Sequence, residues 1–166
     1  MEIAFYHLSK ARVEQALPVL LERTLSKGWR AIVQTNNDAR VAKLNQDLWA
    51  YKPESFLPHG VNGDPDLGSL PIFLTATNDN PNTADVRFFI DGVEMGGVLN
   101  SAAAPKERAI LLFDGGNEDE LTAARDQWRA LKDAGFDLVY YQQSEQGNWL
   151  EKHRSAKSTS RSEEHT

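Results

Sequence analysis

Hydrophobic and polar positions along this chain follow two patterns, which together predict an α/β fold. Short apolar runs typical of buried strands occupy residues 2–8, 30–35, 71–75, 86–91, 109–114 and 136–143. Segments whose apolar residues recur every three or four positions lie between several of these runs and predict helices. Strands that alternate with helices favour a parallel sheet. We therefore expect a three-layer α/β fold in which helices flank a mostly parallel sheet.

Three segments have the helical pattern. Residues 11–28 contain Pro18, which predicts a kink or a late helix start because a proline inside a helix costs about 3 kcal/mol. Residues 36–51 begin with Asn and Asp side chains that can cap a helix. The most regular pattern spans residues 118–135 and ends at a glycine. It places four apolar side chains on one face: Leu121, Ala124, Trp128 and Leu131.

The length and charge of the chain limit what it can be. Its 166 residues suit a single α/β domain, which we expect over residues 1–152, followed by a flexible polar tail at residues 153–166. The net charge is −6, and the segment 151–166 is slightly basic, so the rest of the chain is more acidic still. Phosphate neutralisation dominates the affinity of nucleic-acid binders, so this balance argues against general DNA binding. A local basic patch could still hold an acidic partner.

The sequence carries few features that would indicate secretion or insertion into a membrane. The chain has no cysteine, which excludes disulfides, zinc fingers and iron–sulfur clusters and fits a reducing cytoplasm. It opens without the positively charged region of a signal peptide. No apolar stretch approaches the ~20 residues that span a bilayer. We therefore expect a cytoplasmic protein that has no membrane partner.

The motifs of common α/β enzymes are missing. The sequence contains no dinucleotide-binding glycine motif, no Walker A motif and no nucleophile elbow, and its four histidines lack metal-ligand spacing. The glycine pair at residues 115–116 leads into an acidic first turn, which suits a helix cap near Asn117 better than a phosphate. We expect no cofactor, no metal and no catalytic site. The alternative is a small enzyme that acts on a nucleotide or another phosphorylated ligand through an unrecognised site.

The stretch LWAYKPESFLPHG, residues 48–60, places much apolar area on a connecting loop. Its prolines, including Pro58, stiffen the loop and so lower the entropy lost when a partner docks. Two interpretations remain open. Either Trp49 and Phe56 anchor a partner, or they cover the end of the sheet while His59 satisfies a loop carbonyl.

The last predicted helix carries a basic stripe beside its apolar face. Three cations lie at i, i+4 and i+7: Arg125, Arg129 and Lys132. With Trp128 as its floor, the stripe would border a groove suited to an acidic peptide with an apolar end, because arginine forks bind carboxylates. In the alternative, Arg129 pairs with Asp126 and Asp133 on its own helix, for about 0.3–0.5 kcal/mol each.

Three segments carry a resemblance to a known family: FYHL at the start, LWAYKPESFLPHG in the loop, and ALKDAGFDLVYYQQSEQGNWLEK near the end. In these segments the chain resembles the chi subunit of bacterial DNA polymerase III, over residues 1 to about 152. The most specific combination lies in the loop: Leu48, Trp49, Ser55, Phe56, Pro58 and His59.

The resemblance implies a non-catalytic accessory subunit of the replication holoenzyme, with a fold like that of nucleotide-binding proteins but without a phosphate loop. Members of the family bind the acidic C-terminal tail of single-stranded-DNA-binding protein, which ends in an apolar dipeptide and a free carboxylate. They also bind psi, a small subunit that links them to the clamp loader. DNA would then be reached only indirectly.

The resemblance also assigns residues to these two partners. The tail site would comprise Arg125, Trp128 and Arg129, with Lys132 on the same stripe. The surface for psi, or for another clamp-loader component, would comprise Trp49, Phe56, Pro58 and His59. Residues 118–121, the turn before Arg125, are acidic or neutral where the family leads us to expect more positive charge, which predicts a weak tail affinity.

Overall fold

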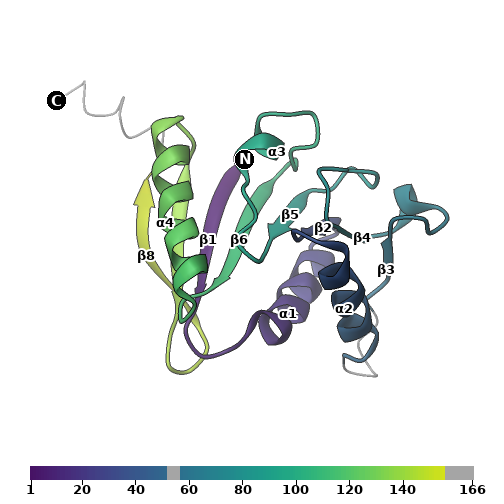
Figure 1. The fold of residues 1–166 in the computed structure, drawn as a ribbon, viewed down its shortest axis with the longest axis horizontal. Coiled ribbons are helices and arrows are strands. Elements are labelled where there is room, and N and C mark those ends of the chain that lie inside the picture. The colour runs from purple at the N-terminus through teal and green to yellow at the C-terminus, as the bar shows by residue number, and fades with distance from the viewer. Residues whose placement is uncertain (52–56, 156–166) are drawn as a thin grey trace.

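A computed structural model describes residues 1–51 and 57–155 and confirms the predicted fold class (Figure 1). Its strands are β1 (Glu2–Leu8), β2 (Ala31–Gln34), β3 (His59–Val61), β4 (Ile72–Thr75), β5 (Val86–Phe89), β6 (Arg108–Asp114), β7 (Leu138–Gln143) and β8 (Trp149–Ser155). They form one sheet in the order β3-β4-β2-β5-β6-β1-β7-β8. Neighbouring strands are parallel except β7 and β8, which are antiparallel.

Helices cover both faces of the sheet and so give three layers. The helices are α1 (Val13–Ser26), α2 (Asp38–Trp49), α3 (Gly96–Leu99) and α4 (Glu118–Asp133), with a 3-10 turn at Leu67–Ser69. Successive side chains of a strand point to opposite faces, and β1 shows the division. Ala4 and Leu8 belong to a buried cluster that they share with α1 and α2. Ile3 and Phe5 belong to a second buried cluster, shared with α3 and α4.

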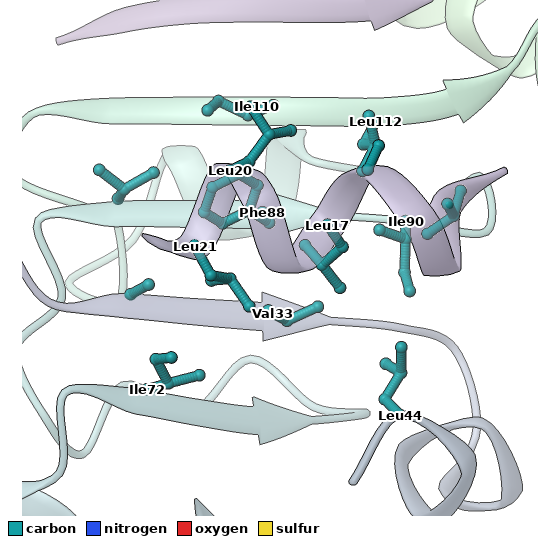
Figure 2. Close-up of a cluster of buried hydrophobic side chains, with 14 of the residues drawn as sticks. Leu17, Leu20, Leu21, Val33, Leu44, Ile72, Phe88, Ile90, Ile110 and Leu112 are labelled. Atoms are coloured by element: carbon teal, nitrogen blue, oxygen red, sulfur yellow. The ribbon is translucent and has the colours of Figure 1, made fainter. Parts of the chain in front are cut away.

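The buried core beneath α1 explains why its strands can be recognised in the sequence as apolar runs. Leu17, Leu20 and Leu21 of α1 pack over β5, where Phe88 lies beside Ile110 of β6 (Figure 2). Every residue of β2, β4 and β5 is buried. Strands covered on both faces read as continuous apolar runs rather than as alternating patterns, and this is the pattern found in the sequence.

The three predicted helices form, each a little shorter than its sequence segment. α1 begins at Val13 and continues through Pro18, which lies inside the helix with its side chain buried, so the start of the helix is not delayed to this proline. Asn37 caps α2 and Asn117 caps α4; the Asn117 side chain accepts a hydrogen bond from the Glu120 amide at 3.0 Å. The prediction of a helix cap near Asn117, followed by an acidic first turn of α4, is therefore confirmed.

Two edge strands differ from the sequence-based expectation. β3 begins at His59, so it takes the last two residues of the stretch 48–60, which the sequence predicted to be a connecting loop. β8 continues through Ser155, so His153–Ser155 belong to the sheet and not to the expected tail. Most side chains of β8 are exposed and the strand is held by backbone pairing with β7, which leaves little trace in a hydrophobicity pattern. The rest of the expected tail, residues 156–166, lies outside the described residues.

Candidate functional site

A hollow of about 350 Å³ lies between α4 and the edge of the sheet formed by β7 and β8. We call it the α4 groove; it is lined by Arg125, Trp128, Arg129, Tyr140 and His153. Three of the four residues predicted for the tail site thus lie together. Lys132 is exposed on the last turn of α4 and is not part of the lining.

The floor of the α4 groove is a packed set of aromatic rings. The half-buried Trp128 ring meets the fully buried Phe5 ring edge to face, with centroids 5.1 Å apart at 72°. It also meets Tyr140 at 5.9 Å and the His153 ring at 5.5 Å. Edge-to-face pairs of this kind add about 0.5–1.5 kcal/mol to area burial. Trp128 is therefore fixed in place before any partner arrives.

The arginines that border the α4 groove are exposed and have no acidic partner among residues 1–51 and 57–155. No described carboxylate lies within 4.0 Å of the guanidinium of Arg125 or Arg129. The alternative in which Arg129 pairs with Asp126 and Asp133 is thus wrong in this structure. Both guanidinium groups remain able to bind a carboxylate from outside.

Beneath the arginines lies a histidine–tyrosine pair that sequence reasoning missed. His7 Nδ1 and Tyr140 Oη are 2.8 Å apart. Burial lowers the pKa of the His7 imidazole, the positive charge of Arg125 lowers it further, and Asp114 opposes the shift. Burial also raises the pKa of the Tyr140 hydroxyl. The pair is therefore uncharged at neutral pH, and the positive charge at this end of the groove comes from the arginines.

A close approach of the backbone holds His7 in position. A Cβ atom at Gly115, directly after β6, would overlap the His7 imidazole. The Gly115 amide donates to the Leu8 carbonyl at 2.9 Å, which ties this turn to the end of β1. The glycine at residue 115 thus gives room to the histidine, a role that the sequence did not indicate.

The turn after β1, where nucleotide-binding folds hold a phosphate, is filled by a side chain of the protein itself. Gln143 Oε1 accepts hydrogen bonds from the amides of Ser9, Lys10 and Ala11 at 3.3, 3.0 and 3.1 Å. Clustered backbone amides bind anions, and here an amide oxygen already satisfies them. Within the described part of the chain, no group of three or more metal-ligating side chains is found. Nothing in this turn supports the alternative of an enzyme that acts on a phosphorylated ligand.

The second predicted surface lies at the opposite end of the sheet. Trp49, the last residue of α2, is 59% exposed, and its ring centroid lies 4.4 Å from that of His59. His59 is buried, with Nδ1 2.7 Å from the Leu57 carbonyl oxygen, so the expectation that it satisfies a loop carbonyl is confirmed. Pro58 is half-buried. Phe56 lies outside the described residues.

The described residues form an α/β domain whose two predicted binding surfaces, the α4 groove and the surface around Trp49, lie at opposite ends of a mostly parallel sheet. The family model described as DNA polymerase III chi subunit, HolC, matches residues 1–139, and the chain belongs to this family. It is similar to the "Probable DNA polymerase III subunit chi" of Rickettsia prowazekii (strain Madrid E), with 29% identity over 115 residues, covering 68% of this chain and 70% of the relative.

The family membership confirms the resemblance found in the sequence. The chain is a non-catalytic accessory subunit of DNA polymerase III. No helix within residues 1–51 and 57–155 is both long and apolar enough to cross a membrane.

Proposed function

We propose that the α4 groove binds the acidic C-terminal tail of single-stranded-DNA-binding protein and so connects that protein to DNA polymerase III. One observation carries the proposal: Arg125 and Arg129 are exposed, have no described acidic partner and border a rigid aromatic floor. A stable fold alone does not need two such arginines around an open hollow.

The chemistry of the groove matches the two ends of such a tail. Guanidinium groups bind carboxylates with paired hydrogen bonds, so Arg125 and Arg129 receive the acidic residues and the terminal carboxylate. The apolar end of the tail packs on Trp128 and Tyr140. Because the floor is already ordered, little side-chain entropy is lost on binding. The acids of the first turn of α4, residues 118–120, reduce the attraction, so the affinity is modest.

The surface around Trp49 is the second half of the proposed function. A large exposed indole resting on a buried imidazole suits an interface anchor, since tryptophan is enriched among the residues that dominate interfaces. Trp49, Pro58 and His59, together with Phe56, would bind psi or another component of the clamp loader. The two surfaces lie at opposite ends of the sheet, so the chain bridges its partners and reaches DNA only through them.

Titration of a fluorescently labelled acidic peptide that ends in Phe tests the tail site. The variant Arg125→Ala with Arg129→Ala should bind at least tenfold more weakly, because each charge-assisted hydrogen bond is worth about 1.5–3 kcal/mol. Lys132→Ala is the matched control, because it removes a cation of the same helix that lies outside the lining. Equal affinity of the double variant and the parent would remove the proposed site.

A further inference from the structure

A second hollow, with a volume of about 270 Å³, lies on the face of the sheet that α1 covers. We call it the α1 pocket. Its floor is apolar, and Figure 2 shows three of the side chains that form it: Leu20, Phe88 and Ile110. Three cations converge on its rim, two from the end of α1 and one from the start of β6: Arg23, Lys27 and Arg108.

The positive charge on this rim is only partly balanced. Arg108 Nε lies 3.4 Å from a Glu2 oxygen, but the other oxygen of Glu2 lies 3.2 Å from Arg154. Arg23 and Lys27 have no carboxylate within 4.0 Å in the described part of the chain. Both are exposed, and the Lys27 ammonium lies 4.9 Å from the centroid of the Trp29 ring.

Helix stability does not explain this arrangement. Cations near the end of a helix are favourable to its dipole, but like charges at i and i+4, as in Arg23 and Lys27, repel by a similar few tenths of a kcal/mol. Neither effect accounts for Arg108, which reaches the same rim from β6. The convergence of three cations over an apolar floor therefore indicates a binding site for an anion with an apolar part.

The size of the pocket limits what the ligand can be. Pockets for cofactors and drug-sized molecules measure about 300–1,000 Å³, so a hollow of about 270 Å³ is suited to one side chain rather than to a whole nucleotide cofactor. We propose that the α1 pocket binds an acidic peptide segment that inserts one apolar side chain onto Leu20 and Ile110. The carboxylates of the segment bind Arg23, Lys27 and Arg108. This site is separate from the α4 groove, which lies on the other face of the sheet.

The neighbouring aromatic residues favour a peptide over single-stranded nucleic acid. Tyr6, which lines the pocket, meets the Trp149 ring edge to face at 62° and the Tyr141 ring in a tilted arrangement at 54°, so these three rings offer no parallel set of faces. Base stacking needs such faces, together with cations that follow the backbone. Here the cations cluster at one point, which suits a short acidic segment better than an extended polyanion.

Methyl and indole NMR of the full chain tests the proposal. The probe is an amidated peptide with one central Phe between aspartates, and its twin carries asparagine in place of each aspartate. We expect the acidic probe to shift the Leu20 and Ile110 methyl signals and the Trp29 indole signal, and the neutral twin to bind at least tenfold more weakly. Added salt should weaken the shifts, because ion pairs at the surface are screened.

Variants of two exposed cations separate this site from the α4 groove. Arg23→Glu with Lys27→Glu should abolish the shifts caused by the acidic probe. Arg23→Gln with Lys27→Gln should weaken the binding of that probe at least tenfold. The matched control, Arg125→Glu with Arg129→Glu, makes the same change of charge on the other face and should leave them intact. The proposal would be overturned if the acidic probe did not shift the Leu20 and Ile110 signals of the parent, or if the Gln variant bound the probe as tightly as the parent does. An oligo-dT strand that shifts the same signals at lower concentration than the acidic peptide would overturn the peptide class.

Discussion

The α4 groove and the surface around Trp49 are the two proposed binding sites, and each contains a tryptophan that the fold holds in a different way. Trp128 is half-buried, fixed by the rings of Phe5 and Tyr140, and bordered by arginines. Trp49 is 59% exposed at the end of a helix, and its described ring contact is with His59. The first arrangement combines two exposed arginines with a packed aromatic floor, whereas the second presents a largely exposed indole beside a buried imidazole. The two surfaces should therefore respond differently to truncation, salt and pH.

Replacing each tryptophan with alanine should give the largest difference between the two surfaces, measured as the loss of free energy of unfolding. We expect Trp128→Ala to lower the free energy of unfolding by about 2–3 kcal/mol, because it removes a packed ring from Phe5 and leaves a cavity. We expect Trp49→Ala to change it by less than about 0.5 kcal/mol, because most of that side chain is already in water. Urea unfolding followed by circular dichroism measures both. A Trp49→Ala variant less stable than Trp128→Ala would reverse the comparison.

A single methyl group at Gly115 should show whether the floor of the groove is preorganised. We expect Gly115→Ala to lower the free energy of unfolding by about 1–3 kcal/mol, since its Cβ overlaps the His7 imidazole and forces it from Tyr140. The variant should also weaken tail-peptide binding several-fold while leaving binding at the Trp49 surface unchanged. Urea unfolding and peptide titration measure the two effects.

Two further variants control the Gly115 experiment. At Gly116, the nearest atom to an added Cβ is a carboxylate oxygen of Asp114 at 3.4 Å, so Gly116→Ala should cost little. Combining Gly115→Ala with His7→Ser should recover part of the lost stability, because the two sites share one contact. If Gly115→Ala lowers the free energy of unfolding by the same amount with and without the His7 ring, the overlap with that ring is not the cause of the loss.

The sequence predicted the parts of the α4 groove that lie on one helix, and little of the rest. Arg125, Trp128 and Arg129 follow helical spacing, so their shared face can be read directly from the chain. Tyr140 and His153 come from β7 and β8 and meet the helix only because these strands pair antiparallel at the sheet edge. No local pattern encodes such a meeting.

The fold shows the same limit of sequence reasoning. The fully buried strands β2, β4 and β5 appear in the sequence as apolar runs, because both of their faces need apolar side chains. The edge strand β8 exposes most of its side chains, so its sequence looks like that of a polar tail. Alternation along β7 does not assign Tyr140 to the face beneath α4 either, because Leu138 and Val139 are both apolar and belong to clusters on opposite faces of the sheet.

Added salt should weaken binding at the two surfaces to different extents, and this difference should be smaller than the effects of the variants above. Raising the salt concentration from about 0.1 M to 1 M shortens the Debye length from about 10 Å to about 3 Å. We expect tail-peptide binding at Arg125 and Arg129 to weaken several-fold over this range, and binding at Trp49 to stay within about twofold. Fluorescence titrations of each partner at three salt concentrations measure the effect. Tail binding that is unaffected by salt would mean that the arginines do not carry it.

The smallest expected effect is the pH dependence of stability that His7 brings to the groove. The folded state lowers the pKa of His7, through burial first and the charge of Arg125 second, while Asp114 opposes the shift. Below the unfolded value of about 6.5, the unfolded chain therefore binds more protons at this site than the folded chain does. The free energy of unfolding should fall as the pH drops from about 6.5 towards the folded pKa, and His7→Gln should make this fall smaller. Urea midpoints of parent and variant at pH 7.5 and pH 5.5 measure the difference, and a parent that loses no more stability than His7→Gln on acidification would show that the imidazole is not held neutral beneath Arg125.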